Sequence, residues 1–243
     1  MSNLTVEQIL NLLRTAEIDL EGEFVHGYNY TFLVKVQPEQ GDSFLAVYKP
    51  QQGEQPLWDF PENTLAHRET AAFLVSQALG WDLVPPTVYR QDGPFGSGSL
   101  QVYIDHDPNH HYFNFTDQEF QLLRPVVLFD LLINNADRKG GHMIFGEDHR
   151  LWLIDHGLCF NVEEKLRTVI WDFAGEPIPD DLCAGIKAFR QKLIAPSALF
   201  DELEEHLSPS EITALIQRTE ALLPCTHFPY PPQDRRAYPF PPV

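Results

Sequence analysis

The chain has 243 residues, of which 43% are hydrophobic and 21% are charged, so it can build a packed core in one domain or two small lobes. Lysine and arginine number 17 against 35 aspartates and glutamates, and the formal net charge of −18 would repel nucleic acid and anionic lipid surfaces at long range. No apolar run reaches the length of a membrane span, the first residues lack a secretory signal pattern, and the three cysteines have no metal-binding spacing, which together favour a cytoplasmic location.

The first hundred residues predict a strand-rich region behind one short helix. A capping box at Thr5 opens a helix that runs to about Ala16. Aromatic and β-branched residues over 24–36 and 44–49 predict a hairpin. A helix capped by Asn63 and stopped after Leu79 by a glycine follows. Two short strands complete this region, near 87–89 and 100–104.

Beyond residue 107 the pattern becomes helical. Helices are expected over 116–133, 180–193, 197–206 and 209–223, and the proline-rich tail 228–243 should be extended, either docked or loose. The fold class that follows is α+β and two-lobed, with a strand-rich N-lobe of about 1–104, a helical C-lobe of about 105–227, and the tail.

Lys49 and Glu69 are the first candidate site residues. Lys49 ends the strand 44–49, and Glu69 lies midway along the helix 63–79 on the same face as its apolar residues Leu65, Ala72 and Phe73. Because a carboxylate on a buried face needs a cationic partner, we expect these two side chains to pair.

Asp137 and Asp155 stand eighteen residues apart and frame a short apolar hairpin. Asp137 follows a buried helical run and an Asn-Asn pair, whereas Asp155 follows the apolar strand 151–154 and precedes Gly157. Since a buried, unpaired carboxylate is costly, both acids are expected to open onto a cleft. His142 lies five residues after Asp137.

Protein kinases space a catalytic aspartate, a metal ligand five residues later and the aspartate of Asp-Phe-Gly in a similar arrangement. The chain resembles the phosphatidylinositol 3-/4-kinase-like branch of the kinase superfamily through Asp137-Arg138 and the run 154–157, Ile-Asp-His-Gly. More narrowly, it is similar over most of its length to bacterial proteins placed in that branch. Those proteins also carry Asn-Asn-Ala-Asp-Arg-Lys-Gly-Gly-His and Trp-Asp-Phe-Ala-Gly-Glu-Pro, here 134–142 and 171–177.

This resemblance implies a role for each candidate. Lys49 would bind phosphates and Glu69 would orient it, Asp137 would position or deprotonate an acceptor hydroxyl, and Asp155 would hold a metal ion. The resemblance also implies an adenine pocket lined by Val47, Ile144 and Ile154, with a hinge at Tyr103, Ile104 and Asp105. The phosphate-covering loop should lie between Gly22 and Phe32, although the Gly-x-Gly-x-x-Gly pattern is missing and backbone donors from His26 to Tyr30 would have to replace it.

His142 stands where kinases place asparagine. Imidazole suits manganese, iron or zinc better than magnesium, which prefers oxygen ligands. One hypothesis is therefore that His142 ligates a divalent ion and shifts the preference toward Mn²⁺. The alternative is that it only hydrogen-bonds the catalytic loop.

The predicted function is ATP-dependent transfer of the γ-phosphoryl group to a hydroxyl of a protein or soluble small molecule, with Mg²⁺ or Mn²⁺ as the metal. AMP transfer on the same fold, a nucleotide-binding pseudokinase that acts as an interaction module, and a metal-dependent hydrolase built on the histidines are the alternatives. A zinc site at 105–107 with His110 and His111 is less expected than a polar hinge loop. Lys165 and Arg167 follow the Asp155 segment, where lipid kinases use basic residues to grip headgroups, but two cations in an acidic protein are more simply explained as a solvated loop.

Overall fold

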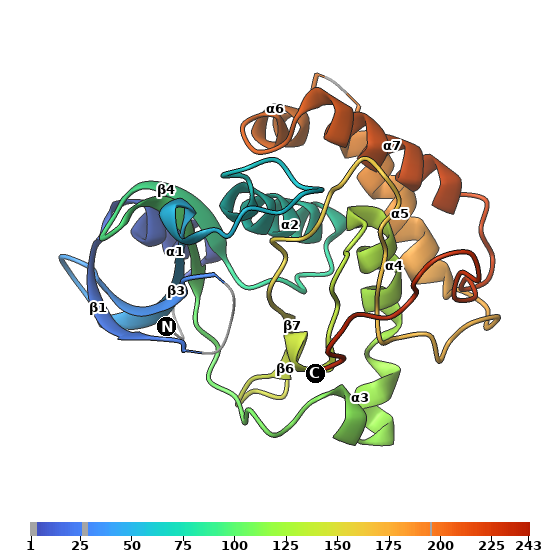
Figure 1. The fold of residues 1–243 in the computed structure, drawn as a ribbon, viewed down its shortest axis with the longest axis horizontal. Coiled ribbons are helices and arrows are strands. Elements are labelled where there is room, and N and C mark those ends of the chain that lie inside the picture. The colour runs from blue at the N-terminus through green and yellow to red at the C-terminus, as the bar shows by residue number, and fades with distance from the viewer. Residues whose placement is uncertain (1–3, 26–28, 195) are drawn as a thin grey trace.

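The computed structural model describes residues 4–25, 29–194 and 196–243. A five-stranded antiparallel sheet forms one lobe, with the strand order β1-β2-β3-β5-β4 (Figure 1). The strands and the helix beside them are α1 (Val6–Thr15), β1 (Glu17–Glu23), β2 (Phe32–Gln37), β3 (Phe44–Pro50), β4 (Thr87–Gly93) and β5 (Gly96–Val102).

Strand β3 shows why this sheet positions the site. Phe44, Ala46 and Tyr48 are buried in an apolar core between the sheet and α1, and residues that alternate with them lie on the opposite face. Val47 and Lys49, both half-buried, therefore share the face turned away from α1.

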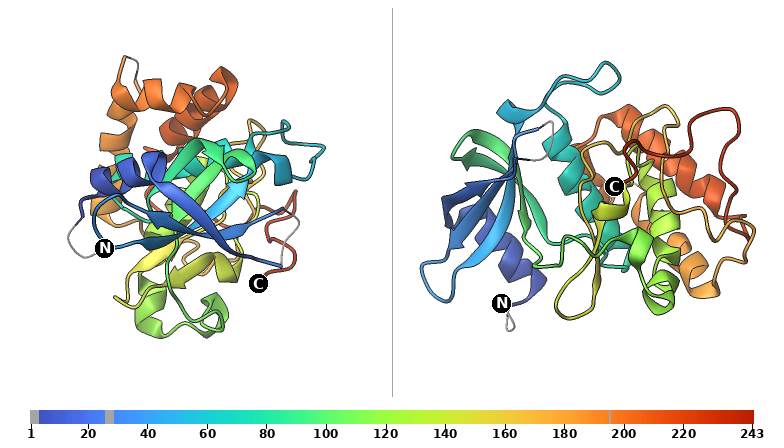
Figure 2. Two further views of the ribbon diagram at one scale, coloured as in Figure 1. Left: turned by 90° about the vertical axis from the view of Figure 1, so that its left-hand side faces the viewer. Right: turned by 60° about the horizontal axis from the view of Figure 1, so that its bottom comes forward.

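The second lobe is mainly helical, and the two lobes lie side by side with α2 between them (Figure 2). Its elements include a two-stranded sheet of β6 and β7. The bounds are α2 (Leu65–Leu79), α3 (Asp117–Gln121), α4 (Arg124–Ile133), β6 (Met143–Phe145), β7 (Leu151–Leu153), α5 (Asp180–Lys192), α6 (Ala198–Glu204) and α7 (Pro209–Leu222), with 3-10 turns η1 (Gln51–Gly53), η2 (Tyr112–Asn114) and η3 (Gly140–His142).

Helix α2 is anchored to the helical lobe. Its buried apolar residues from Ala71 to Leu79 belong to the same cluster as those of α4, α5 and α7. Arg68 pairs with Glu211 of α7, and Ser76 Oγ accepts from the backbone of Leu83 at 2.7 Å. Most of its residues are buried, so α2 is enclosed on several sides rather than along one stripe.

The α+β, two-lobed prediction is confirmed, but several predicted boundaries are wrong. The strand expected over 24–36 is β2 alone, and β1 was not predicted because its residues are mostly exposed and show no apolar alternation. Asn63 is not the cap of α2, since it has a left-handed φ of 58° and Thr64 takes the N-cap position. The carboxylate of Glu54 instead accepts from the first two amides of α2, at 3.2 and 2.9 Å.

The helix expected over 116–133 is also wrong as one element. It divides into α3 and α4 at residues 122 and 123, and Pro125 lies in the first turn of α4, where its missing N–H costs nothing. The helices expected at the C-terminal end are present as α5, α6 and α7, and α7 begins with the capping box of Ser208 and Glu211.

The proline-rich tail is docked and ends beside β6 and β7 (Figure 1). The carbonyl of Ala237 accepts from the backbone of Thr168 at 3.0 Å and from the indole of Trp171 at 3.3 Å. The carbonyl of Pro242 accepts from the backbone of Gly140 at 2.8 Å. None of the helices formed by the described residues combines the length and the hydrophobicity that a membrane span requires.

Candidate active site

Lys49 of β3 bonds two carboxylates that come from distant parts of the chain. Its Nζ lies 2.5 Å from Glu69 Oε1 and 2.9 Å from Asp155 Oδ1. Glu69 is almost fully buried, whereas the side chain of Asp155 is half-exposed. The structure thus brings together three of the residues predicted from the sequence, and it forms the expected pair of Lys49 and Glu69.

The charges in this cluster stabilise one another. Burial favours the neutral amine, but Asp155 and Glu69 raise the pKa of Lys49 above its usual value. Burial would raise the pKa of Glu69, yet Lys49 lowers it to about 2. Lys49 also holds the pKa of Asp155 below its usual range. All three groups are therefore ionised at neutral pH, with a half-exposed carboxylate next to an ammonium.

Asp155 has a strained backbone. Its φ is 62°, in the left-handed region, which costs a residue with a side chain roughly 1–2 kcal/mol. Such conformations persist only where neighbouring contacts hold them, and they concentrate at functional sites. The backbone N–H of the next residue, His156, donates to Glu69 Oε2 at 2.9 Å and supplies such a contact.

His142 ends the turn η3 and lies beside Asp155, with 3.3 Å between its Nε2 and Asp155 Oδ2. Burial lowers the pKa of His142 to about 4, although Asp155 opposes the shift, so the ring is neutral at neutral pH. Lys139 N donates to its Nδ1 at the long distance of 3.5 Å. The alternative that His142 only hydrogen-bonds the catalytic loop is thus supported by one weak contact.

Among the described residues, Asp137 forms no hydrogen bond or ion pair with Lys49, Glu69 or Asp155. Its side chain is about one-quarter exposed and pairs with Lys139 Nζ at 3.3 Å. Its backbone N–H donates to Asn135 Oδ1 at 2.9 Å, which fixes the loop in an Asx-type turn. Burial raises the pKa of Asp137 while Lys139 opposes that shift, so this carboxylate is more basic than an ordinary aspartate.

The predicted adenine residues come from both lobes, Val47 from β3, Ile144 from β6 and Ile154 from the residue after β7. Val47 and Ile154 are half-buried and Ile144 is buried. The backbone of Tyr103 donates to Leu45 of β3 at 3.0 Å, so the predicted hinge leaves the sheet beside that strand. A Cβ placed on Gly146 would lie 3.3 Å from Ile104, which brings the hinge against the end of β6. Residues 26–28 of the predicted phosphate loop lie outside the described residues.

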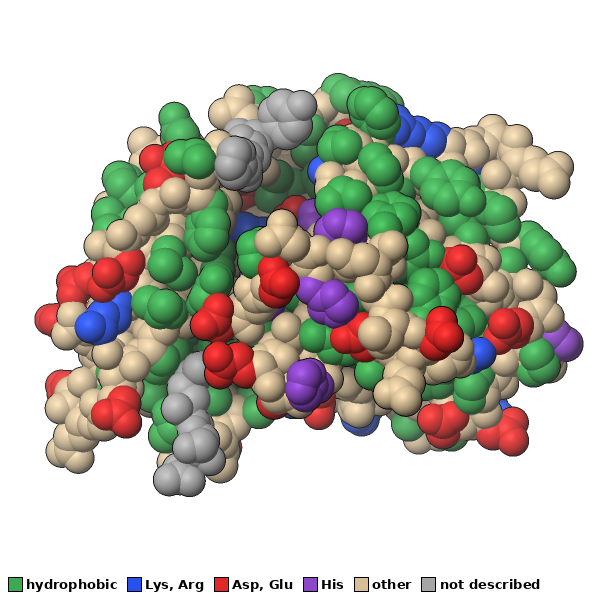
Figure 3. Space-filling model, turned by 90° about the horizontal axis from the view of Figure 1, so that it is seen from below, with side chains coloured by type: hydrophobic (Ala, Val, Ile, Leu, Met, Phe, Trp, Pro, Cys, Tyr) green, Lys and Arg blue, Asp and Glu red, His purple; other side chains and the backbone are tan. Residues whose placement is uncertain are grey.

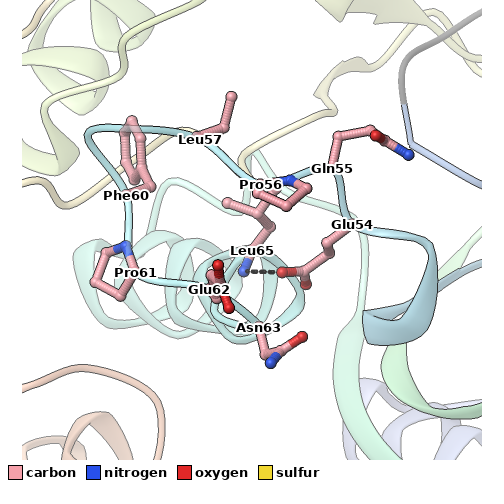
Figure 4. A pocket seen from close by; sticks show the side chains of 9 residues that line it. All are labelled: Glu54, Gln55, Pro56, Leu57, Phe60, Pro61, Glu62, Asn63 and Leu65. Carbon is pink, nitrogen blue, oxygen red and sulfur yellow. Dashed lines mark hydrogen bonds between the residues drawn. The ribbon is translucent and has the colours of Figure 1, made fainter.

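A hollow lies between the two lobes, and basic and histidine side chains are visible at its wall (Figure 3). A separate small pocket of about 60 Å³ is formed by the loop that precedes α2, where Glu54 reaches the first amide of the helix (Figure 4). Neither Lys49 nor Asp155 lines it, so we assign this pocket to the capping of α2.

Donor chemistry at His142 and Asp155 fits a divalent ion. The neutral imidazole nitrogen and the carboxylate oxygen lie 3.3 Å apart. This distance is close to the separation of about 3 Å between two neighbouring ligand atoms on one small ion. In the part of the chain that the structure describes, no three His, Cys, Asp or Glu side chains converge as a preformed metal site. A metal here would need further oxygens from a nucleotide or water. At the suggested zinc loop, His110 contacts Glu119 at 2.9 Å.

No family model matches the sequence. Protein Rv2133c of Mycobacterium tuberculosis is 38% identical over 265 aligned residues, which cover 95% of this chain and 94% of that protein. The chain belongs to the Rv2133c family.

Solved structures similar to this Rv2133c-family chain include two that are named as kinases. Hydra Fam20 with sugar has a TM-score of 0.54 at 15% identity, over 89% of this chain and 86% of that one. The Golgi casein kinase with Mn/ADP bound has a TM-score of 0.52 at 18% identity, over 90% and 74%. The proinflammatory kinase CtkA of Helicobacter pylori has a TM-score of 0.53 at 11% identity, over 86% and 92%. These likenesses confirm the kinase-like fold.

Sequence reasoning missed the residue that organises the site in this Rv2133c-family chain. Arg138 is fully buried and bonds Asp130 through Nε and Nη2, at 3.0 and 2.9 Å. Its Nη1 donates to the carbonyls of His142 and Ile154, at 3.2 and 3.1 Å. One guanidinium therefore fixes the loop after Asp137 to Ile154, the residue just before Asp155. The available signal was an aspartate inside the apolar run 125–133.

Lys139 was also missed, although it stands inside the run 134–142 that carries the family resemblance. Two residues after Asp137, its side chain is one-fifth exposed and its ammonium pairs with the Asp137 carboxylate. An ammonium that neutralises Asp137 can equally contact an anionic group brought to it.

Proposed function

We propose that this protein is an ATP-dependent phosphotransferase that moves the γ-phosphoryl group to a hydroxyl of a protein or a soluble small molecule. The observation that carries the proposal is the bonding of Lys49 to both Glu69 and Asp155, at 2.5 and 2.9 Å, in a kinase-like fold. Phosphoryl transfer depends on positioning and electrostatic stabilisation, and this cluster supplies a fixed cation beside an accessible carboxylate.

Each residue has a proposed role. Lys49 contacts the phosphates of the nucleotide, and Glu69 orients Lys49 from α2. Asp155 and His142 hold a divalent ion, Mg²⁺ or Mn²⁺, which neutralises charge on the phosphate oxygens when bound. The neutral ring of His142 leaves a nitrogen lone pair for Mn²⁺, which accepts imidazole more readily than Mg²⁺ does.

Asp137 acts on the acceptor. It sits on the loop after α4, and its raised pKa makes its carboxylate a better acceptor for the proton of a hydroxyl. Val47, Ile144 and Ile154 surround the adenine, with Tyr103 and Ile104 as the hinge. The single catalytic domain over 1–243, with lobes divided near residue 104, remains a prediction.

The acceptor is a protein side chain or a soluble small molecule. A net charge of −18 disfavours approach to an anionic membrane. A lipid acceptor is therefore the less favoured outcome. Membership of the phosphatidylinositol 3-/4-kinase-like branch and a cytoplasmic location stay predictions from the sequence.

The proposal is tested with ATP labelled at the α or the γ phosphate, incubated with Mg²⁺ or Mn²⁺ and a mixture of acidic and basic proteins. Only the γ label should be transferred by the wild-type protein. The matched control is Lys187→Met, which changes an exposed lysine and should transfer the γ label as wild type does. Lys49→Met and Asp155→Asn should reduce transfer at least a hundredfold, since each removes electrostatic stabilisation of the transferred group. Transfer of α label alone would establish AMP transfer instead, and intact ATP with every metal would indicate a pseudokinase.

A further inference from the structure

His156 follows Asp155 directly and is fully buried. Its ring packs edge-on against Phe129 of α4, with ring centroids 5.8 Å apart at 83°. Phenylalanine occupies this position in the Asp-Phe-Gly motif of kinases, so packing alone does not require an imidazole here.

The hydrogen bonds of His156 define which ring nitrogen carries the proton. Its Nε2 lies 2.9 Å from Arg138 Nη2. A guanidinium has donors only, so Nε2 must accept. A doubly protonated ring would turn a second donor toward the guanidinium, and the ring is therefore neutral with its proton on Nδ1.

That Nδ1–H is a buried donor with no hydrogen-bond partner among the described residues. The nearby acceptor is Glu69 Oε2 at 3.7 Å, the oxygen that already accepts from the backbone N–H of His156 at 2.9 Å. A buried donor left unpaired costs about 1–3 kcal/mol, so it needs an explanation.

Together these groups form a polar chain through the site that is open at one link. Asp130 of α4 bonds Arg138, Arg138 bonds His156, and His156 faces Glu69, which bonds Lys49 of β3. The chain connects the helical lobe to the sheet. Only the contact between His156 Nδ1 and Glu69 is longer than a hydrogen bond.

We propose that His156 is a positioning residue that holds Glu69, and through it Lys49, and that its Nδ1–H closes onto Glu69 Oε2 when nucleotide draws the two lobes together. This role rests on the proposed function, because it concerns the lysine assigned to the phosphates. Contacts of this kind are often long in the empty site and shorten in the complex.

Three substitutions separate the two nitrogens. His156→Phe keeps the ring shape against Phe129 but removes both polar contacts. His156→Asn places an amide nitrogen near Nδ1 and keeps a donor for Glu69, whereas His156→Gln places an oxygen near Nε2 and keeps an acceptor for Arg138. His227→Phe changes an exposed histidine and is the matched control.

The first measurement is nitrogen-15 NMR of histidine-labelled wild-type protein, with and without a non-hydrolysable ATP analogue and Mg²⁺. We expect the Nδ1–H tautomer of His156 and a downfield shift of that proton on addition of the analogue. The second is the rate at which an amine-reactive reagent labels Lys49 in the presence of the same analogue and Mg²⁺, the state in which the contact is proposed to close. It should rise about tenfold in His156→Phe, recover in His156→Asn more than in His156→Gln, and stay unchanged in His227→Phe.

In phosphoryl transfer, kcat should fall about tenfold in His156→Phe with little change in KM for ATP. An Nε2–H tautomer, or wild-type Lys49 labelling and kcat in His156→Phe, would overturn the proposal. If wild type transfers no phosphoryl group, the proposed function fails, while the tautomer and the labelling rates still decide the role of His156. If His156→Phe does not fold, the comparison of the Asn and Gln variants decides it.

Discussion

Arg138 and Asp130 form an ion pair in which both side chains are completely buried, at the base of the loop that carries Asp137. Removing one partner of such a pair leaves an uncompensated charge in the interior, which costs about 3–5 kcal/mol. The charge stays satisfied only while α4 and the loop keep their relative positions, so the pair determines where Asp137 and His142 stand.

The first prediction concerns this pair. Asp130→Asn should lower the free energy of unfolding by about 3 kcal/mol or more, measured in urea at neutral pH. Glu220→Gln breaks the contact of Glu220 with Arg190 at 2.6 Å, where both side chains are about two-fifths exposed, and it should cost less than about 1 kcal/mol. Equal losses in the two variants would contradict the importance given to burial.

The second prediction concerns metal preference at His142. His142→Asn replaces the imidazole by an oxygen-bearing amide, and we expect the ratio of activity with Mn²⁺ to activity with Mg²⁺ to fall several-fold. Activity is measured as γ-phosphoryl transfer at saturating metal. If wild type is more active with Mg²⁺ than with Mn²⁺, and His142→Asn leaves that activity unchanged, His142 does not ligate the ion.

The third prediction concerns acid sensitivity. Lys49 lowers the pKa of Glu69 from 4.5 to about 2 in the folded protein, so Glu69 contributes stability that is present above pH 4.5 and lost as the pH falls toward 2. The difference in unfolding free energy between wild type and Glu69→Gln should therefore shrink by about 3 kcal/mol as the pH falls from neutral to 2. A constant difference over that range would show that the pKa of Glu69 is not lowered.

The fourth prediction concerns the docked tail. Deleting residues 236–243 removes the carbonyl acceptors for the amides of Gly140 and Thr168, at 2.8 and 3.0 Å. We expect faster hydrogen exchange at both amides and a loss of about 1–3 kcal/mol in unfolding free energy. Phe240→Ala alters a side chain that is 78% exposed and should leave exchange at both positions unchanged. Unaltered exchange after the deletion would contradict a docked tail.

Much of this fold could be predicted because its signals are local. Capping boxes at Thr5 and Ser208 mark the starts of α1 and α7, and each is present in the structure. The inward position of Glu69 follows from helical spacing with Leu65, Ala72 and Phe73, all of which are buried.

Other features depend on contacts between distant residues and leave no local pattern. β1 pairs along an exposed edge without apolar alternation. The N-terminus of α2 is capped by Glu54 from the preceding loop, not by the neighbouring Asn63. The burial of Arg138 becomes visible only when α4 and the strand before Asp155 are folded together.

A crystal structure with a non-hydrolysable ATP analogue and Mn²⁺ would test the central claim most directly, because anomalous scattering locates the manganese independently of the protein atoms. We predict manganese within bonding distance of Asp155 and His142 and the phosphates against Lys49. Nucleotide bound elsewhere, with Lys49 still held only by Glu69 and Asp155, would contradict the account.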